Sequence, residues 1–179
     1  MTLPSFRYHP DPIASGSIVA SDAKCRCCKK ARGYIYTGPV YAERDLEDAL
    51  CPWCIADGKA AEKFDASFVD PEAVNSDVPQ AALDELCERT PGYNAWQGGA
   101  WPACCGDAAR YVAPVGHDEL EEAYRAWQGS VLNHIIYDMQ ISGGAAMRLL
   151  QSLRRDQGPT AYLFECCMCG RHHVHVDSP

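Results

Sequence analysis

The chain has 179 residues, eleven cysteines and a formal net charge of −8. This length allows one large domain or two small ones, and no apolar run approaches the ~20 residues that cross a bilayer, so a membrane protein is excluded. Residues 1–70 carry 9 basic against 10 acidic side chains, whereas residues 71–179 carry 7 arginines against 14 acidic side chains. The acidic second part disfavours nucleic-acid phosphates and favours basic partners, although solubility alone also explains such a charge.

The chain opens with an arm over residues 6–12, whose two prolines disfavour a helix and favour an extended backbone. We expect His9 in this arm to pack or to form hydrogen bonds rather than to act as a ligand or base. The first residues lack the basic start, apolar run and cleavage site of a secretory signal. We therefore expect a cytoplasmic protein, whose cysteines bind metal or stay reduced.

The strongest motif is a set of four cysteines with zinc-ribbon spacing: Cys25, Cys28, Cys51 and Cys54. A two-residue gap turns backbone amides toward both sulfurs, and two such knuckles place four thiolates around one ion. Residues 33–38 and 39–42 are predicted to form a strand pair between the knuckles. A redox dithiol at the second knuckle would follow a buried strand, but residues 42–50 are acidic and helical in character. The spacing predicts structural zinc.

Basic residues crowd around the first knuckle: Lys24, Arg26, Lys29, Lys30 and Arg32. They could bind phosphate, or they could balance the charge of about −2 that four thiolates leave on one zinc ion. We favour charge balance because acidic residues follow within residues 43–48. Cys27, inside the knuckle, is not expected to be a ligand.

Three helices are predicted in the middle of the chain. Residues 59–64 have helical composition, and after a loop over residues 71–78 a helix begins near Asp77 and ends at residues 90–92. Residues 117–127 also have helical spacing. The apolar face of the helix near Asp77 contains Ala82, Leu83, Leu86 and Cys87.

The segments between these helices and the tail are less regular. Residues 93–101 are rich in glycine and aromatics, which we expect to close a core rather than to stack on a ligand. Residues 131–141 fit a helix or a strand, and we expect His134 there to be a core residue. Residues 145–155 are predicted to be a helix with three side chains inward: Met147, Leu150 and Leu153.

The tail carries a second metal motif, because residues 161–164 and 173–177 predict a β-hairpin around another cysteine knuckle. Cys166 and Cys169 would supply two ligands of a second zinc site, and Cys105 is our first choice for the third. The fourth is left open among Cys104, Cys87, His172, His173 and Asp107, and a metal-free hairpin is the alternative. The sequence has no Ser/His/Asp order, phosphate loop or histidine-rich open site, so we expect structural zinc and no enzyme.

Several segments, in the same order, resemble the CbrC family: residues 6–12, 31–41, 51–58, 88–92, 105–107, 162–164 and 169–170. The resemblance covers nearly the whole chain. It implies a cytoplasmic bacterial immunity or tolerance factor, since the named member of that family is linked to tolerance of a nuclease colicin. Three cysteines look like local additions to the family pattern: Cys27, Cys104 and Cys167.

These observations predict an α+β protein. A small zinc-ribbon unit with short antiparallel strands, over residues 1–70, joins an acidic α+β part, over residues 71–179, that ends in a zinc-knuckle hairpin. The predicted function is a zinc-stabilised protein-binding module that neutralises a basic nuclease toxin, with Trp96, Trp101 and Trp127 as candidate anchors. The alternative from another class is a nucleic-acid-binding ribbon that uses residues 24–32; a zinc hydrolase is a third hypothesis. The oligomeric state is left open.

Overall fold

The computed structural model describes residues 2–74 and 78–179, and it mixes short helices with small antiparallel sheets. This composition is the predicted α+β class. The strands are β1 (Ile18–Lys24), β2 (Ala31–Tyr36), β3 (Ala103–Cys104), β4 (Asp107–Ala108), β5 (Arg110–Val115), β6 (Thr160–Glu165) and β7 (His172–Asp177). The helices are α1 (Pro52–Ala56), α2 (Lys59–Phe64), η1 (Pro71–Ala73), α3 (Gln80–Arg89), α4 (His117–Glu122), η2 (Arg125–Trp127), α5 (Gln128–Asn133), η3 (His134–Asp138) and α6 (Gly143–Ser152).

The first sheet is a two-stranded ribbon in which β2 pairs with β1, from Ile18 opposite Tyr36 to Lys24 opposite Ala31. The predicted pairing of residues 33–38 with residues 39–42 is therefore wrong. Pro39 has no N–H to donate to a neighbouring strand. The chain after β2 instead forms a curl over the buried Tyr36, whose hydroxyl donates a hydrogen bond to the Pro39 carbonyl at 2.7 Å. A Cβ at Gly38 would lie 2.5 Å from that hydroxyl, so the curl requires glycine.

Residues 42–50 form turns and bends rather than the helical segment that their composition suggested. Leu46 and Leu50 in this segment are buried against the first cysteine motif. The Asp45 carbonyl accepts a hydrogen bond from the Arg26 guanidinium at 2.7 Å, so a side chain outside the segment supplies the partner that a helix would otherwise provide for this carbonyl. Packing against the ribbon thus overrides local helix propensity here.

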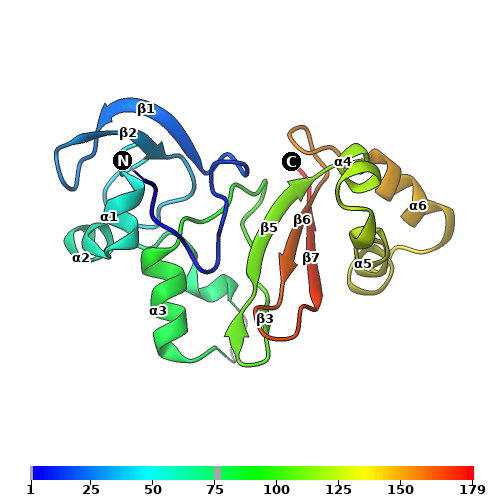
Figure 1. The fold of residues 1–179 in the computed structure, drawn as a ribbon. Coiled ribbons are helices and arrows are strands. Elements are labelled where there is room, and N and C mark those ends of the chain that lie inside the picture. Colours follow the sequence, from blue (N-terminus) through cyan, green and yellow to red (C-terminus); the bar gives the residue numbers. More distant parts are fainter. Residues whose placement is uncertain (1, 75–77) are drawn as a thin grey trace.

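The second main sheet has the order β5-β6-β7, and β6 at its centre is buried on both faces. Ala161 and Leu163 pack with the helical layer, whereas Tyr162 and Phe164 pack into an aromatic cluster on the opposite face. Figure 1 shows α4, α5 and α6 on one side of this sheet, and α3 with the amino-terminal elements on the other. The alternation along β6 explains why a run of five apolar or neutral residues is fully buried.

Two helices differ from their prediction in position or phase. Asp77, near which the first of these helices was predicted to begin, lies outside the described residues. Pro79 was predicted within its first turn but precedes α3 as its cap, and the helix ends at Arg89, next to the predicted stop at residues 90–92. Helix α6 begins at Gly143, and its buried residues are Ala146 and Leu150. Met147 is 45% exposed, so its predicted inward orientation is wrong; the buried stripe continues instead to Leu153, just beyond the helix. Of the ambiguous residues 131–141, residues 131–138 are helical, and they include the π-helix η3.

The amino-terminal arm lies against the carboxyl-terminal sheet. The Tyr8 carbonyl accepts a hydrogen bond from the Tyr111 N–H at 2.8 Å, and Tyr8 is fully buried. His9 is buried, with 2.8 Å hydrogen bonds to the Pro91 carbonyl and to Ser15 Oγ, so its expected packing role is confirmed. Burial lowers the pKa of His9 to about 4, so its imidazole is neutral at pH 7. Among the described residues, no helix has the length and apolarity of a membrane span.

Candidate metal centres

The first four cysteines converge from the β1–β2 ribbon and from helix α1. Cys25 and Cys28 lie in the turn after β1, Cys51 caps α1, and Cys54 lies within that helix. Their sulfur atoms all lie within 4.8 Å of one another. Three of them are almost fully buried, with 0% exposure for Cys25 and Cys51 and 2% for Cys54. We call this set the buried tetrad.

A second set gathers from the β3–β4 turn and from the knuckle between β6 and β7, and its sulfurs also lie within 4.8 Å of one another: Cys104, Cys105, Cys166 and Cys169. Cys105 has a φ of +55° and Gly106 a φ of +73°. This left-handed turn lets two adjacent cysteines face the same point, although neighbours in an extended chain point apart. We call this set the surface tetrad, because Cys105 and Cys169 are exposed.

The sulfur spacing in both sets fits a tetrahedral ion. With zinc–sulfur bonds of about 2.3 Å, the edges of a regular tetrahedron of sulfurs are about 3.8 Å long. The Sγ atoms of Cys28 and Cys51 are 3.9 Å apart, and Cys104 Sγ lies 3.7 Å from Cys105 Sγ and 3.8 Å from Cys169 Sγ. Neutral thiols are weak hydrogen-bond donors, so such contacts alone do not account for four converging sulfurs. All eleven cysteines, each within the described residues, are free of disulfides.

Backbone amides favour the thiolate form in each tetrad. The Cys51 N–H donates to Cys25 Sγ at 3.3 Å, and the N–H groups of Met168 and Cys169 each donate to Cys166 Sγ at 3.4 Å. The Cys51 thiol, together with backbone amides, lowers the pKa of Cys25 to about 4. Amides of Cys169 and Met168 lower the pKa of Cys166 to about 6. Since thiolate is the metal-binding form, each tetrad contains a ligand already prepared for a cation.

All seven cysteines that the sequence proposed as ligands fall within the two tetrads. Cys104 completes the second set, whereas Cys27 and Cys167 lie outside both. The other candidates for the fourth position have different surroundings. Cys87 is buried in the aromatic cluster, and the Asp107 carboxylate accepts hydrogen bonds from Arg7 and Tyr8. The sequence left Cys104 open as one of five candidates for the fourth ligand, because it looks like a local addition to the pattern of the CbrC family.

The basic residues near the buried tetrad are partly engaged by the protein itself. Arg26 donates to the Asp45 carbonyl, and the Arg32 guanidinium lies 5.4 Å from the centre of the Trp53 ring. Lys63, which sequence reasoning did not connect with this motif, donates to the carbonyl of Cys27 at 2.9 Å. These contacts bring positive charge close to the thiolates, as the charge-balance interpretation requires.

Comparison with known proteins places the chain among close relatives. The profile of a family described as "Uncharacterised protein family (UPF0167)" matches residues 3–178. UPF0167 protein Mb2317 of Mycobacterium bovis is 45% identical over 176 residues, which are 98% of this chain and 93% of the relative. UPF0167 protein PA1536 of Pseudomonas aeruginosa is 41% identical over 177 residues, which are 98% of this chain and 97% of the relative. No solved structure matches the chain.

Proposed function

The chain belongs to the UPF0167 family. We propose that it is a cytoplasmic protein-binding module that binds a basic segment of a partner protein. One zinc ion in each tetrad would stabilise this module. The observation that carries this proposal is an acidic hollow of about 640 Å³ between α2 and α3. Five exposed carboxylates line it: Asp57, Glu62, Asp65, Asp84 and Glu88. Arg89 is the basic side chain among its lining residues.

The buried tetrad supports the acidic hollow mechanically. Cys54 lies in α1, and α2 follows after Gly58, whose φ of +75° sets the angle between the two helices. A Cβ at Gly58 would lie 3.1 Å from Arg89 Nε, so α3 packs closely at this corner. An ion bound by the tetrad would therefore fix the wall that α2 contributes. A rigid concave surface with five carboxylates against one guanidinium attracts positive charge strongly.

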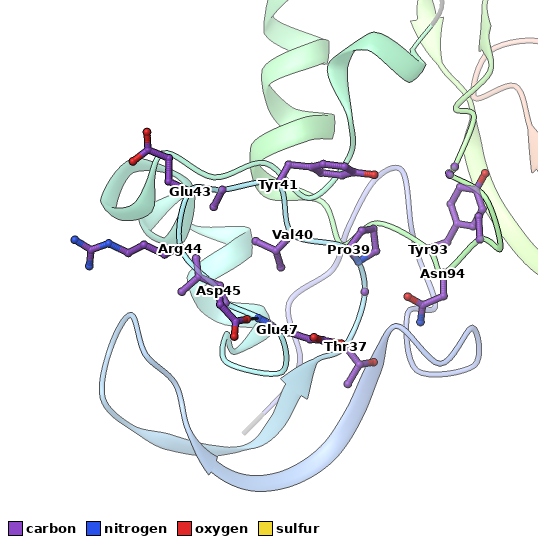
Figure 2. A pocket seen from close by; sticks show the side chains of 16 residues that line it. Thr37, Pro39, Val40, Tyr41, Glu43, Arg44, Asp45, Glu47, Tyr93 and Asn94 are labelled. Atoms are coloured by element: carbon purple, nitrogen blue, oxygen red, sulfur yellow. Dashed lines mark hydrogen bonds between the residues drawn. The ribbon is translucent and has the colours of Figure 1, made fainter.

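A second hollow adjoins the first at Tyr41. It has a volume of about 410 Å³ and lies between residues 37–47 and the loop that contains Tyr93 and Asn94. Figure 2 shows Tyr41 and Tyr93 on its two sides. Tyr41 lines both hollows and is 40% exposed, which suits an aromatic anchor at an interface.

Two of the three tryptophans proposed as anchors are too buried to serve as such. Trp101 is 1% exposed and Trp127 is 8% exposed, so both belong to the core and cannot contact a partner. Trp96 remains accessible, at 41% exposure. Tyr41 replaces the two buried side chains as the aromatic group that lies next to the acidic hollow.

The partner that we propose is a nuclease toxin, which the chain would neutralise as an immunity or bacteriocin-tolerance factor. Nucleases carry basic surfaces that bind phosphate, and an acidic hollow is complementary to such a surface. The resemblance of residues 6–12, 31–41 and 51–58 to the CbrC family supports this choice. The chain would act by covering the toxin and not by catalysis.

Reversal of two charges in the acidic hollow tests the proposal. Glu62→Lys with Glu88→Lys, one residue from each wall, is expected to weaken binding to a purified nuclease-colicin domain about 10- to 100-fold, because favourable charge pairs become repulsive. The matched control is Glu121→Lys with Glu122→Lys on α4, which makes the same change of net charge away from the hollow and should leave binding unchanged. Absence of binding to any basic nuclease domain, with no protection of cells that express one, would reject the proposal.

The second candidate function is nucleic-acid binding by the β1–β2 ribbon. Lys24, Lys29 and Lys30 are exposed at the end of this ribbon, and two-stranded ribbons fit nucleic-acid grooves. Duplex DNA and RNA therefore serve as further probes in the same assay. Salt-dependent binding that survives the Glu62 and Glu88 reversals, and is lost on Lys29→Glu with Lys30→Glu, would favour this candidate.

A further inference from the structure

Four of the six histidines of the chain line one cavity, of about 480 Å³, between η3 and β7: His134, His172, His173 and His175. Strand β7 is an edge strand of its sheet, and the helical layer lies beside it. The cavity is separate from both tetrads, because none of their eight cysteines lines it. Sequence reasoning considered His172 and His173 as ligands of the tail cysteines and expected His134 to be a core residue. It did not connect the two segments, because they lie far apart in the chain.

The helical wall of this histidine cavity contains a histidine oriented by a carboxylate. His134 Nδ1 lies 2.8 Å from a carboxylate oxygen of Asp138, and both residues line the cavity. The two residues form the ends of the π-helix η3, a helix type that is frequent at functional sites. A carboxylate on Nδ1 fixes that nitrogen as the protonated one and leaves Nε2 with a free lone pair. This is the usual support of a metal-binding imidazole.

The strand wall contributes His175, whose Nε2 atom, like that of His173, is buried and has no hydrogen-bond partner within the described residues. The ring lies nearly parallel to Tyr162, with 6.0 Å between ring centres, so its plane is held. Burial lowers the pKa of His175; the Asp177 carboxylate opposes this shift, and His134 adds to it. The imidazole is therefore neutral at pH 7, which is the form that binds metal.

His172 has other partners. Its ring stacks on Trp127 with 3.6 Å between ring centres, and its Nδ1 lies 3.3 Å from Ser130 Oγ. Within the described residues, groups of three or more ligand atoms within 4.8 Å of one another occur only at the cysteines, so the histidine cavity is not a closed cage. His134 and His175 face the cavity from its two walls, with His173 beside His175, and an ion held by two imidazoles has room for water at its remaining positions, as open metal sites do.

We propose that the histidine cavity binds one Zn²⁺ ion through Nε2 of His134 and Nε2 of His175, with Asp138 positioning His134. Imidazole nitrogens suit zinc and its neighbours among the divalent transition metals. Two neutral ligands hold an ion less tightly than four thiolates, so this third ion exchanges while the tetrads keep theirs. This zinc site would be an addition to the proposed protein-binding function, and neither proposal depends on the other.

Calorimetric titration of the full-length protein with zinc chloride tests this site. The protein first passes over a weak chelating resin, which leaves the tetrads loaded. We expect one further equivalent, weakened at least 100-fold by His134→Gln with His175→Gln and about 10- to 100-fold by Asp138→Asn. The matched control is His117→Gln on α4, outside the cavity, which should bind like the unchanged protein. Thermal unfolding without added zinc checks that each variant is folded.

Substoichiometric Ni²⁺ gives an independent measurement, because a paramagnetic ion broadens the ring-proton signals of the histidines that bind it. We expect the signals of His134 and His175 to broaden first and that of His117 to stay sharp. Absence of a further zinc equivalent would overturn the proposal. A further equivalent that survives in the double variant, or that is lost equally in His117→Gln, would show adventitious surface binding only and would also overturn it.

Discussion

Cys51→Ser is expected to unfold the amino-terminal ribbon and its helices, whereas Cys27→Ser is expected to leave them folded. Both side chains are buried in the same core, but only Cys51 belongs to the buried tetrad. Structural zinc contributes about 10–16 kcal/mol of apparent binding free energy, which exceeds the stability of most small domains. Cys27→Ser buries one hydroxyl and should cost about 1–3 kcal/mol. Far-UV circular dichroism and amide protection in residues 18–64 measure the difference.

The surface tetrad provides the contrast within the same chain. Cys105→Ser should release one metal ion and loosen the β3–β4 turn, yet leave β5, β6 and β7 paired. Those strands are held by the helical layer and by the aromatic cluster, and Cys105 itself is exposed. The account would fail if Cys51→Ser kept both its metal and its amide protection, or if Cys27→Ser lost them to the same extent.

Trp101→Ala is expected to lower the free energy of unfolding by about 3–5 kcal/mol, which is the usual cost of removing a large aromatic side chain from a core. Trp101 is 1% exposed, its ring centre lies 5.4 Å from that of Phe164, and its Nε1–H donates to the Ala109 carbonyl at 2.8 Å. Removal leaves a cavity and an unpaired carbonyl together. Urea unfolding, followed by fluorescence and circular dichroism, measures the change.

Trp96→Ala is the matched control for this prediction. Trp96 comes from the same glycine-rich loop but is 41% exposed, and its Nε1–H donates to Thr160 Oγ1 at 3.0 Å. Its loss should cost about 1 kcal/mol. Equal destabilisation by the two alanine variants would contradict the central place of the aromatic cluster, in which Tyr93 and Tyr111 also stack with 4.7 Å between ring centres.

Local sequence signals sufficed where a pattern and its partner lie close together. The β6–knuckle–β7 hairpin followed from the apolar run before Cys166 and the alternating residues after Cys169, and α3 followed from its apolar face and from the stop at residues 90–92. The spacing of Cys25 and Cys28 against Cys51 and Cys54 likewise identified a set that the fold gathers. In each case, the deciding contacts lie within about 30 residues.

Features that depend on distant contacts were missed. Residues 34–36 could pair with either neighbour, and the packing of Tyr36 against Pro39 favoured β1. Met147 points outward because the buried stripe of α6 passes through Ala146, Leu150 and then Leu153, with helical spacings of four and three residues that leave Met147 beside the stripe. The choice of Cys104 among the five candidates for the fourth ligand, and the gathering of the histidine cavity, depend on segments that meet only in the folded chain. A local sequence pattern does not indicate which distant segments of the chain will meet.

The amount of metal bound to the full-length chain tests the central claim most directly. After exposure to a weak chelator, native mass spectrometry with elemental analysis is expected to find two zinc ions per chain, one for each tetrad. Cys51→Ser and Cys105→Ser should each retain one ion, and Cys27→Ser should retain both. A chain that carries no metal, and whose unfolding curve is unchanged by a strong chelator, would contradict the account.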